Sequence, residues 1–178
     1  MEKLSELEGA ALGLIWDEGP MTAYAVRSHF QKSRSSHFSG SAGAIYPLVK
    51  RMLTAGLLVA SARHQGRRAS TINKITASGR QALRTWLTPV EDWMVAVEFD
   101  PIRTRVHFLA TLSPKKRAQF LRDAEEKLEA EILATEELVS GLAADDNPWS
   151  TWSARGALAV LSARREWIMA MRREMGGA

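Results

Sequence analysis

The sequence predicts a mainly α-helical protein that carries one small β-hairpin in its first half and long helices in its second half. Apolar residues recur every three or four positions along most of the chain, which is typical of helices that bury one face. One stretch instead has two short apolar segments on either side of a Gly-Arg-Arg turn, which predicts a hairpin. Between positions 121 and 142 the apolar spacing is close to a heptad, which predicts one long helix.

Two helices are predicted at the start of the chain. Apolar residues spaced from Leu4 onwards favour a first helix that ends near Asp17, because Gly19-Pro20 then interrupts the pattern. Thr22 is a suitable N-cap for a second helix over about residues 23–32.

A third helix is predicted after the serine- and glycine-rich stretch SRSSHFSGSAG, which we expect to be a loop. Ser39 or Ser41 is the expected N-cap, and the helix runs to about Ala55. Gly56 then ends it in the manner of a C′ glycine.

Pro47 lies inside this third helix, where a proline removes a backbone donor and typically costs about 3 kcal/mol. The carbonyl four residues earlier belongs to Gly43, which has no side chain to crowd a bend. Two interpretations remain open. Either the bend positions Tyr46 and Lys50 for binding, or it is a tolerated kink with no functional role.

A hairpin and a further helix follow. The segments LLVASAR and ASTINKI are the expected strands, with GRR at their turn. Thr76 or Ser78 then begins a helix that runs to about Leu87. Three helices, a two-stranded hairpin and another helix within about 85 residues are the order of a winged helix-turn-helix.

Thr88-Pro89 is the expected boundary between a winged helix-turn-helix domain, residues 1–88, and a helical domain, residues 89–178. The helical domain is expected to contain three stretches, over about residues 91–112, 113–142 and 149–175. Asp100-Pro101 breaks the first, and Ser113-Pro114 begins the second with an N-cap followed by proline at N1.

The long helix has an apolar seam that needs a partner helix. That partner is either a second copy of the chain or the last helix, which could fold back as a hairpin on the same seam. We expect a homodimer, with an interface formed by Leu121, Leu128, Ile132, Val139, Leu161 and Ile168.

Charge is distributed unevenly along the chain. No Asp or Glu occurs between Glu18 and Glu91, a gap of 72 residues that contains eleven Lys or Arg. Residues 1–88 have twelve basic and five acidic residues, whereas residues 89–178 have twelve and fifteen. Surfaces normally intersperse both signs, so the first half is expected to bind a polyanion.

Other classes of protein fit the sequence poorly. The chain has no cysteine, which excludes disulfides and thiolate metal sites and is compatible with a reducing cytoplasm. Its start, MEKLSELEG, lacks the pattern of a signal peptide, and no apolar run is long enough to span a membrane. The four histidines lack metal-ligand spacing, and no phosphate loop or nucleophile elbow is present. We therefore expect that the protein is not an enzyme and that it binds no metal and no cofactor.

As an ordered set, several short motifs resemble the PadR-like family of transcriptional regulators. In that family a Gly-Pro turn is followed by a Gly-Tyr pair that opens the second helix, a Tyr-Pro-Leu-x-Lys-Arg recognition helix, a Gly-Leu ending, a basic wing and a Leu-Thr-x-x-Gly helix start. This sequence departs from the pattern at Ala23, where glycine is usual. The corresponding residues are Gly19-Pro20, Ala23-Tyr24, Tyr46-Pro47-Leu48-Val49-Lys50-Arg51, Gly56-Leu57, Arg67-Arg68 and Ile75-Thr76-Ala77-Ser78-Gly79. The match covers about residues 4–88.

The resemblance implies a homodimer that binds double-stranded DNA, most often as a repressor on a palindromic operator. The residues expected to contact DNA are Tyr24, Ser39, Ser41, Ala42, Tyr46, Lys50, Arg51, Arg67 and Arg68. The small residues would face base edges, the tyrosines and helix bases would face phosphates, and the wing arginines would enter the minor groove. A winged helix that binds only protein partners is the alternative, and salt-sensitive DNA binding separates the two.

The resemblance also implies release from DNA by a small aromatic or hydrophobic effector. Trp93, Phe99 and Trp152 are the residues expected to line its pocket, although tryptophans at helical spacing are more often simply part of a core.

Overall fold

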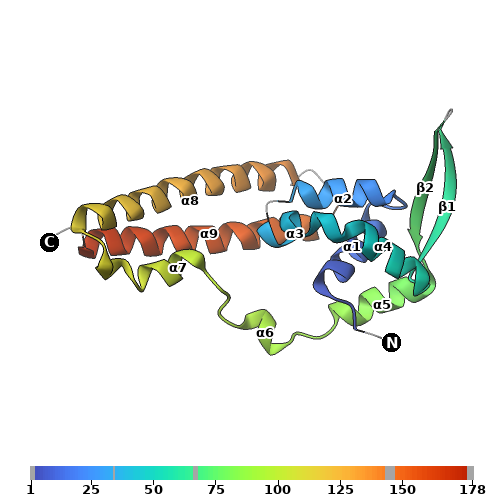
Figure 1. The fold of residues 1–178 in the computed structure, drawn as a ribbon, viewed down its shortest axis with the longest axis horizontal. Coiled ribbons are helices and arrows are strands. Elements are labelled where there is room, and N and C mark those ends of the chain that lie inside the picture. The colour runs from blue at the N-terminus through green and yellow to red at the C-terminus, as the bar shows by residue number, and fades with distance from the viewer. Residues whose placement is uncertain (1–2, 34, 66–67, 143–146, 176–178) are drawn as a thin grey trace. The chain divides into compact units, whose positions relative to one another are not determined.

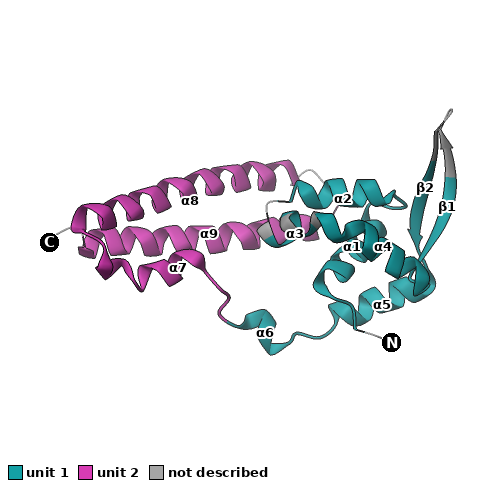
Figure 2. Ribbon diagram, in the orientation of Figure 1, with its two compact units in different colours: residues 1–96 teal, residues 97–178 magenta. Residues whose placement is uncertain are grey.

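The computed structural model describes residues 3–33, 35–65, 68–142 and 147–175. It divides into two compact units, residues 1–96 and 97–178 (Figure 2). In the first unit the elements are α1 (Glu6–Asp17), α2 (Ala23–Gln31), α3 (Ser36–Ser41), a 3₁₀ segment (Ala42–Ala44), α4 (Ile45–Thr54), β1 (Leu58–Gln65), β2 (Arg68–Ile75), α5 (Ala77–Leu87) and α6 (Asp92–Val95) (Figure 1). In the second they are α7 (Pro101–Val106), a 3₁₀ segment (Leu109–Thr111), α8 (Pro114–Leu142) and α9 (Pro148–Met175).

The first unit is a helical bundle with one hairpin, as the sequence predicts. Its helices pack around a core to which α1 contributes Leu12 and Ile15, α2 contributes Val26, and α4 contributes Ile45 and Leu48. Strands β1 and β2 pair antiparallel, and their register joins Leu58 to Ile75 at the base of the hairpin. The order of helices and strands is that of a winged helix-turn-helix, in which β1 and β2 form the wing.

The stretch before the third predicted helix is not a loop. Residues 36–41 form α3, and a 3₁₀ segment connects it to α4. Ser39 and Ser41 therefore lie in α3, where their hydroxyls donate to the carbonyls of Ser35 and His37 at 3.1 and 2.7 Å. The expected N-cap is wrong, since α4 follows Ala44 with no side-chain cap.

The 3₁₀ segment between α3 and α4 explains how the fold accommodates Pro47. Because α4 begins at Ile45, Pro47 is the third residue of its first turn rather than an interior residue. Amides in the first turn of a helix have no intrahelical acceptor, so a proline there removes no hydrogen bond.

Pro47→Ala is accordingly expected to change the free energy of unfolding by less than about 1 kcal/mol, with a small loss from the more flexible unfolded chain. Urea denaturation of both proteins measures the difference. A gain of about 3 kcal/mol would instead indicate that Pro47 strains a helix interior.

Helix ends in the first unit follow the sequence closely. Thr22 caps α2 by accepting from the Ala25 amide at 3.0 Å. Gly56 has a φ of +69°, and its amide and that of Leu57 donate back to α4 carbonyls at 3.1 and 2.9 Å, which is a Schellman ending. Thr76 rather than Ser78 caps α5.

The second unit is dominated by α8 and α9, which lie side by side as an antiparallel hairpin (Figure 1). Leu121 and Leu128 of α8 are buried together with Ile168 of α9. An ion pair from Arg165 to Glu129, at 3.2 Å, joins the two helices at their surface. The apolar seam of α8 is thus covered by α9 of the same chain, which is the hairpin alternative.

The first helical stretch of the second half is shorter than predicted. Between residues 91 and 112 only α6, α7 and a 3₁₀ turn form, and residues 96–100 are not helical. The predicted break is present, because the Asp100 carboxylate caps α7 by accepting from the amides of Ile102 and Arg103. Ser113 caps α8, as expected, with its hydroxyl 3.4 Å from the Lys116 amide.

Candidate nucleic-acid interface

The exposed face of α4 carries the strongest candidates for DNA contact. Leu48 and Val49 face the core, whereas Tyr46 and Lys50 are exposed. Tyr24, at the start of α2, is also exposed, at 66% of its surface. These side chains can reach an external ligand because the core does not use them.

Lys50 and Arg51 differ in what they are free to bind. Within the described part of the chain, Lys50 forms no ion pair. Arg51 instead donates from Nη2 to Oε1 of Glu8 at 3.1 Å. Glu8 belongs to the capping box of α1, in which it and Ser5 exchange hydrogen bonds. Arg51 therefore ties α4 to the start of α1, so it would have to leave Glu8 to contact a phosphate.

The contacts of Glu8 make its contribution to stability pH-dependent. Burial alone raises the pKa of Glu8, but hydrogen bonds from Ser5 and Arg51 outweigh burial and lower the pKa below its ordinary value of 4.5. A carboxyl with a lower pKa in the folded state stabilises the fold above its unfolded pKa and loses that effect as the pH falls through its folded pKa.

Glu8→Gln is therefore expected to lower the free energy of unfolding by about 0.5–1 kcal/mol at neutral pH, a small value because Arg51 is exposed. The difference between the two proteins should close as the pH falls below 4.5. Urea denaturation at a series of pH values measures it, and a difference that stays constant down to strongly acidic pH would contradict this role.

The other residues expected to contact DNA are half-buried or lie partly outside the described residues. Ser39 and Ser41 are half-buried in α3, and Ala42 begins the 3₁₀ segment before α4. Arg67 lies outside the described residues. The backbone of Arg68 pairs with that of Gln65 at the start of β2, and its side chain is not among those described.

Of the proposed effector residues, Trp93 lies in the first unit, whereas Phe99 and Trp152 lie in the second. The indole of Trp93 donates to Glu91 at 2.8 Å, and Lys3 pairs with the same carboxylate at 2.5 Å. The Lys3 and Trp93 hydrogen bonds lower the pKa of Glu91. Trp152 is exposed, with the Arg155 guanidinium 5.3 Å from its ring centroid.

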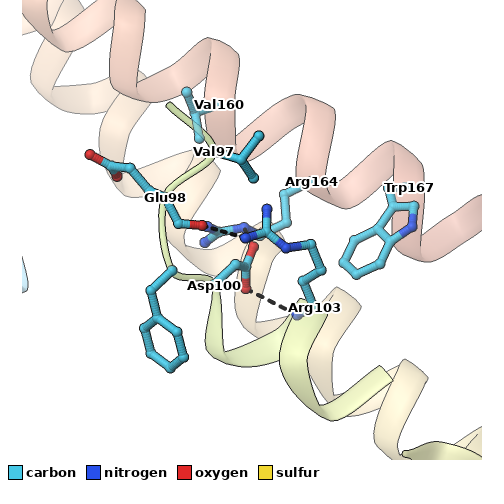
Figure 3. A pocket seen from close by; sticks show the side chains of 8 residues that line it. Val97, Glu98, Asp100, Arg103, Val160, Arg164 and Trp167 are labelled. Atoms are coloured by element: carbon cyan, nitrogen blue, oxygen red, sulfur yellow. Dashed lines mark hydrogen bonds and ion pairs between the residues drawn. The ribbon is translucent and has the colours of Figure 1, made fainter. Parts of the chain in front are cut away.

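Phe99 lines a cavity of about 500 Å³ between the segment before α7 and the side of α9. Asp100 and Arg164 line it as an ion pair (Figure 3), with Arg164 Nε 2.9 Å from the Asp100 carboxylate. Trp167 and Arg103 complete the cationic and aromatic side of the cavity (Figure 3). Neither Arg164 nor Trp167 stood out in the sequence, because nothing in their spacing on α9 marks which of its residues face this segment.

The residues predicted for the dimer interface have different exposures. Leu121, Leu128 and Ile168 are buried within one chain, with Ile168 at 0% exposure, so they present almost no surface to a second copy. Ile132, Val139 and Leu161 are half-buried, and their role in an interface stays a prediction. Exposed apolar residues on the same two helices include Leu133, Leu138 and Val160.

Two kinds of site find no support in the described residues. They contain no group of three or more His, Cys, Asp or Glu side chains placed to hold a metal ion. Of the described helices, none combines the length and apolar character needed to cross a bilayer.

The fold, with its exposed basic recognition helix, defines a winged helix-turn-helix of the DNA-binding class. Comparison with known proteins narrows the class. Residues 11–85 match the model of the transcriptional regulator PadR-like family. The chain is 25% identical over 145 residues to the negative transcriptional regulator PadR of Bacillus subtilis, an overlap of 81% of this chain and 79% of that protein. Both matches confirm the resemblance to the PadR-like family that the sequence motifs indicate.

Solved structures show that the likeness of fold extends over both units. Bacillus subtilis PadR in complex with operator DNA aligns with a TM-score of 0.82 at 19% identity, over 96% of this chain and 99% of that one. The same protein in complex with p-coumaric acid aligns with a TM-score of 0.77 at 20% identity, over 96% and 95% of the two chains.

Proposed function

We propose that this chain is a sequence-specific DNA-binding repressor that acts in the cytoplasm. The observation that carries the proposal is the exposed face of α4, where Tyr46 and Lys50 project from a helix whose other face is core. No acidic residue occurs in the sequence between positions 19 and 90, the stretch that contains α2 and α4. The operator-bound structure of the Bacillus subtilis relative supports the same use of the fold.

We also infer that the protein acts as a homodimer, since a two-fold dimer matches a palindromic operator. The hairpin buries Leu121, Leu128 and Ile168 within the chain, so a second copy must contact other residues. The exposed apolar residues Leu133 and Leu138 of α8 are suited to that surface. Sedimentation equilibrium should give twice the mass of the chain, and a monomer at micromolar concentration would contradict this part of the proposal.

An effector that lowers DNA affinity is part of the same proposal. Such a molecule acts if it binds the free dimer better than the DNA-bound one. The cavity of about 500 Å³ beside Phe99 supports this role, because Trp167 and the bases Arg103 and Arg164 line it together with Phe99. Trp93 lines a smaller cavity of about 150 Å³ with Trp86. The p-coumaric acid complex of the relative supports testing small aromatic acids there first.

The deciding experiment is titration of the purified protein with DNA from upstream of its own gene, beside random DNA, at several salt concentrations. A steep decrease of affinity with salt, together with preference for the upstream fragment, is expected of a specific regulator. A steep decrease without preference would contradict sequence specificity. Absence of binding at low salt by a folded protein would overturn the proposal and favour a protein-interaction module.

A further inference from the structure

A groove in the second unit combines positive charge with an apolar floor. It lies where α8 begins and α9 ends, at the same end of the hairpin (Figure 1), and has a volume of about 1020 Å³. That volume is at the upper end of the range of small-molecule pockets. The basic residues around it are Lys115, Arg117, Arg122, Arg172 and Arg173.

Most of this charge is not neutralised by the protein. Arg172 pairs with Glu125, but within the described part of the chain Lys115, Arg117 and Arg173 form no ion pair. Glu174 is the one acidic residue among the described residues that line the groove. The surrounding half of the chain has more acidic than basic residues, so the cluster does not reflect average composition.

The basic residues of α8 lie at the end of the helix where positive charge is unfavourable. The N-terminus of a helix is the positive end of its dipole and favours acidic side chains. Helix α1 follows this rule with Glu6 and Glu8 in its first turn, whereas the first turn of α8 has no acidic residue and carries Lys115. An anion bound in the groove would relieve this repulsion.

The apolar floor of the groove indicates that its ligand has an apolar part as well as an anionic group. Ala118 and Leu121 of α8 and Met169 of α9 line it between the bases. Methionine side chains adapt to irregular apolar ligands, and a phosphate or a nucleic-acid backbone would leave this surface uncovered. The lining therefore fits a molecule with an anionic head and an apolar tail.

We propose that this groove binds an amphiphilic anion, a straight-chain carboxylate or alkyl sulfate. Its head group lies among Lys115, Arg117 and Arg173, and its tail lies over Leu121 and Met169. The site is distinct from the DNA-binding surface and from the cavity beside Phe99, and its occupation does not depend on DNA binding.

Calorimetric titration of the full chain, without DNA, tests the proposal with dodecanoate below its micelle concentration. Saturable binding of one dodecanoate per chain is expected. Dodecyltrimethylammonium has the same tail and the opposite charge, and inorganic phosphate has the charge without the tail. Each should bind at least about tenfold more weakly. Equal binding of the cationic detergent would overturn the charge argument, and equal binding of phosphate would overturn the argument from the floor.

Two charge reversals on α8 supply the matched comparison. Lys115→Glu and Arg117→Glu should each weaken dodecanoate binding by about tenfold or more. Lys127→Glu makes the same change at an exposed position of the same helix outside the groove and should leave binding unchanged. Circular dichroism and urea midpoints verify that each variant is folded. Absence of saturable binding to the native chain, or undiminished binding to both groove variants, would overturn the proposal.

Discussion

Lys50→Glu is expected to reduce affinity for operator DNA by about tenfold or more at physiological salt. Lys50 projects from the exposed face of α4 and has no ion pair within the described part of the chain, so its charge is available to a phosphate. Each lost phosphate contact lowers the slope of log affinity against log salt by about 0.9. In a dimer the change occurs twice, so the slope should fall by about two.

The control for this variant is Lys127→Glu, which changes the net charge of the chain by the same amount on α8 in the second unit. Fluorescence anisotropy with labelled operator at four or more salt concentrations measures both proteins. If the two variants lost affinity equally, the loss would result from the change in overall charge. That outcome would contradict a direct contact between Lys50 and DNA.

Gly79→Ala is expected to destabilise the fold by about 2 kcal/mol. A Cβ at position 79 would lie 2.1 Å from the backbone carbonyl oxygen of Leu57 and 2.8 Å from Cγ1 of Ile75. That carbonyl cannot move away freely, because it accepts from the Thr76 amide at 3.0 Å and the Thr76 hydroxyl at 3.1 Å. The clash outweighs the helix propensity that alanine adds, which is about 1 kcal/mol.

Gly13→Ala gives the matched comparison for Gly79→Ala. Gly13 is also in a helix, α1, but a Cβ there would meet only Leu83 at an ordinary contact distance of 3.9 Å. This variant should be more stable than the native protein by about 0.5–1 kcal/mol. Urea denaturation compares the three proteins, and a loss of less than about 0.5 kcal/mol for Gly79→Ala would show that the contact between α5 and the backbone of Leu57 can relax.

The start of α5 shows why a short motif could be recognised in the sequence. Thr76 caps the helix by accepting from the Gly79 amide at 2.9 Å, and its hydroxyl donates to the Gly56 carbonyl at 2.7 Å. Gly56 ends the preceding helix with a positive φ, and Gly79 lets α5 approach the backbone of Leu57. These roles depend on residue type at fixed spacing, so they can be predicted locally.

Helix α3 shows where local propensity fails. Serine and glycine favour loops, and seven of the eleven residues in SRSSHFSGSAG are serine or glycine. In the fold, Phe38 packs against the hydrophobic core of the first unit, with its ring centroid 5.4 Å from that of Phe30. Burial of this side chain stabilises a helix that the local sequence disfavours.

The candidate DNA interface was predicted in part. The exposure of Lys50 follows from helical periodicity, since Lys50 lies off the apolar stripe of α4. Tyr24 and Tyr46, which the family resemblance predicts at the interface, are exposed as well. The pairing of Arg51 with Glu8 joins residues 43 positions apart, so no local sequence pattern predicts it. Whether the exposed residues contact DNA stays a prediction.

The sequence by itself determined the order of the main helices and of the hairpin, apart from α3, together with most of their caps and the acid-free stretch between positions 19 and 90. These features depend on residue type and short spacing, which the chain carries before it folds. The tertiary structure decided which partner covers each apolar face and which charges remain free. Only packing shows that α9 covers the seam of α8, and that Arg51 has a partner while Lys50 has none within the described residues. The physical reason is that both outcomes depend on which distant residues meet when the core closes.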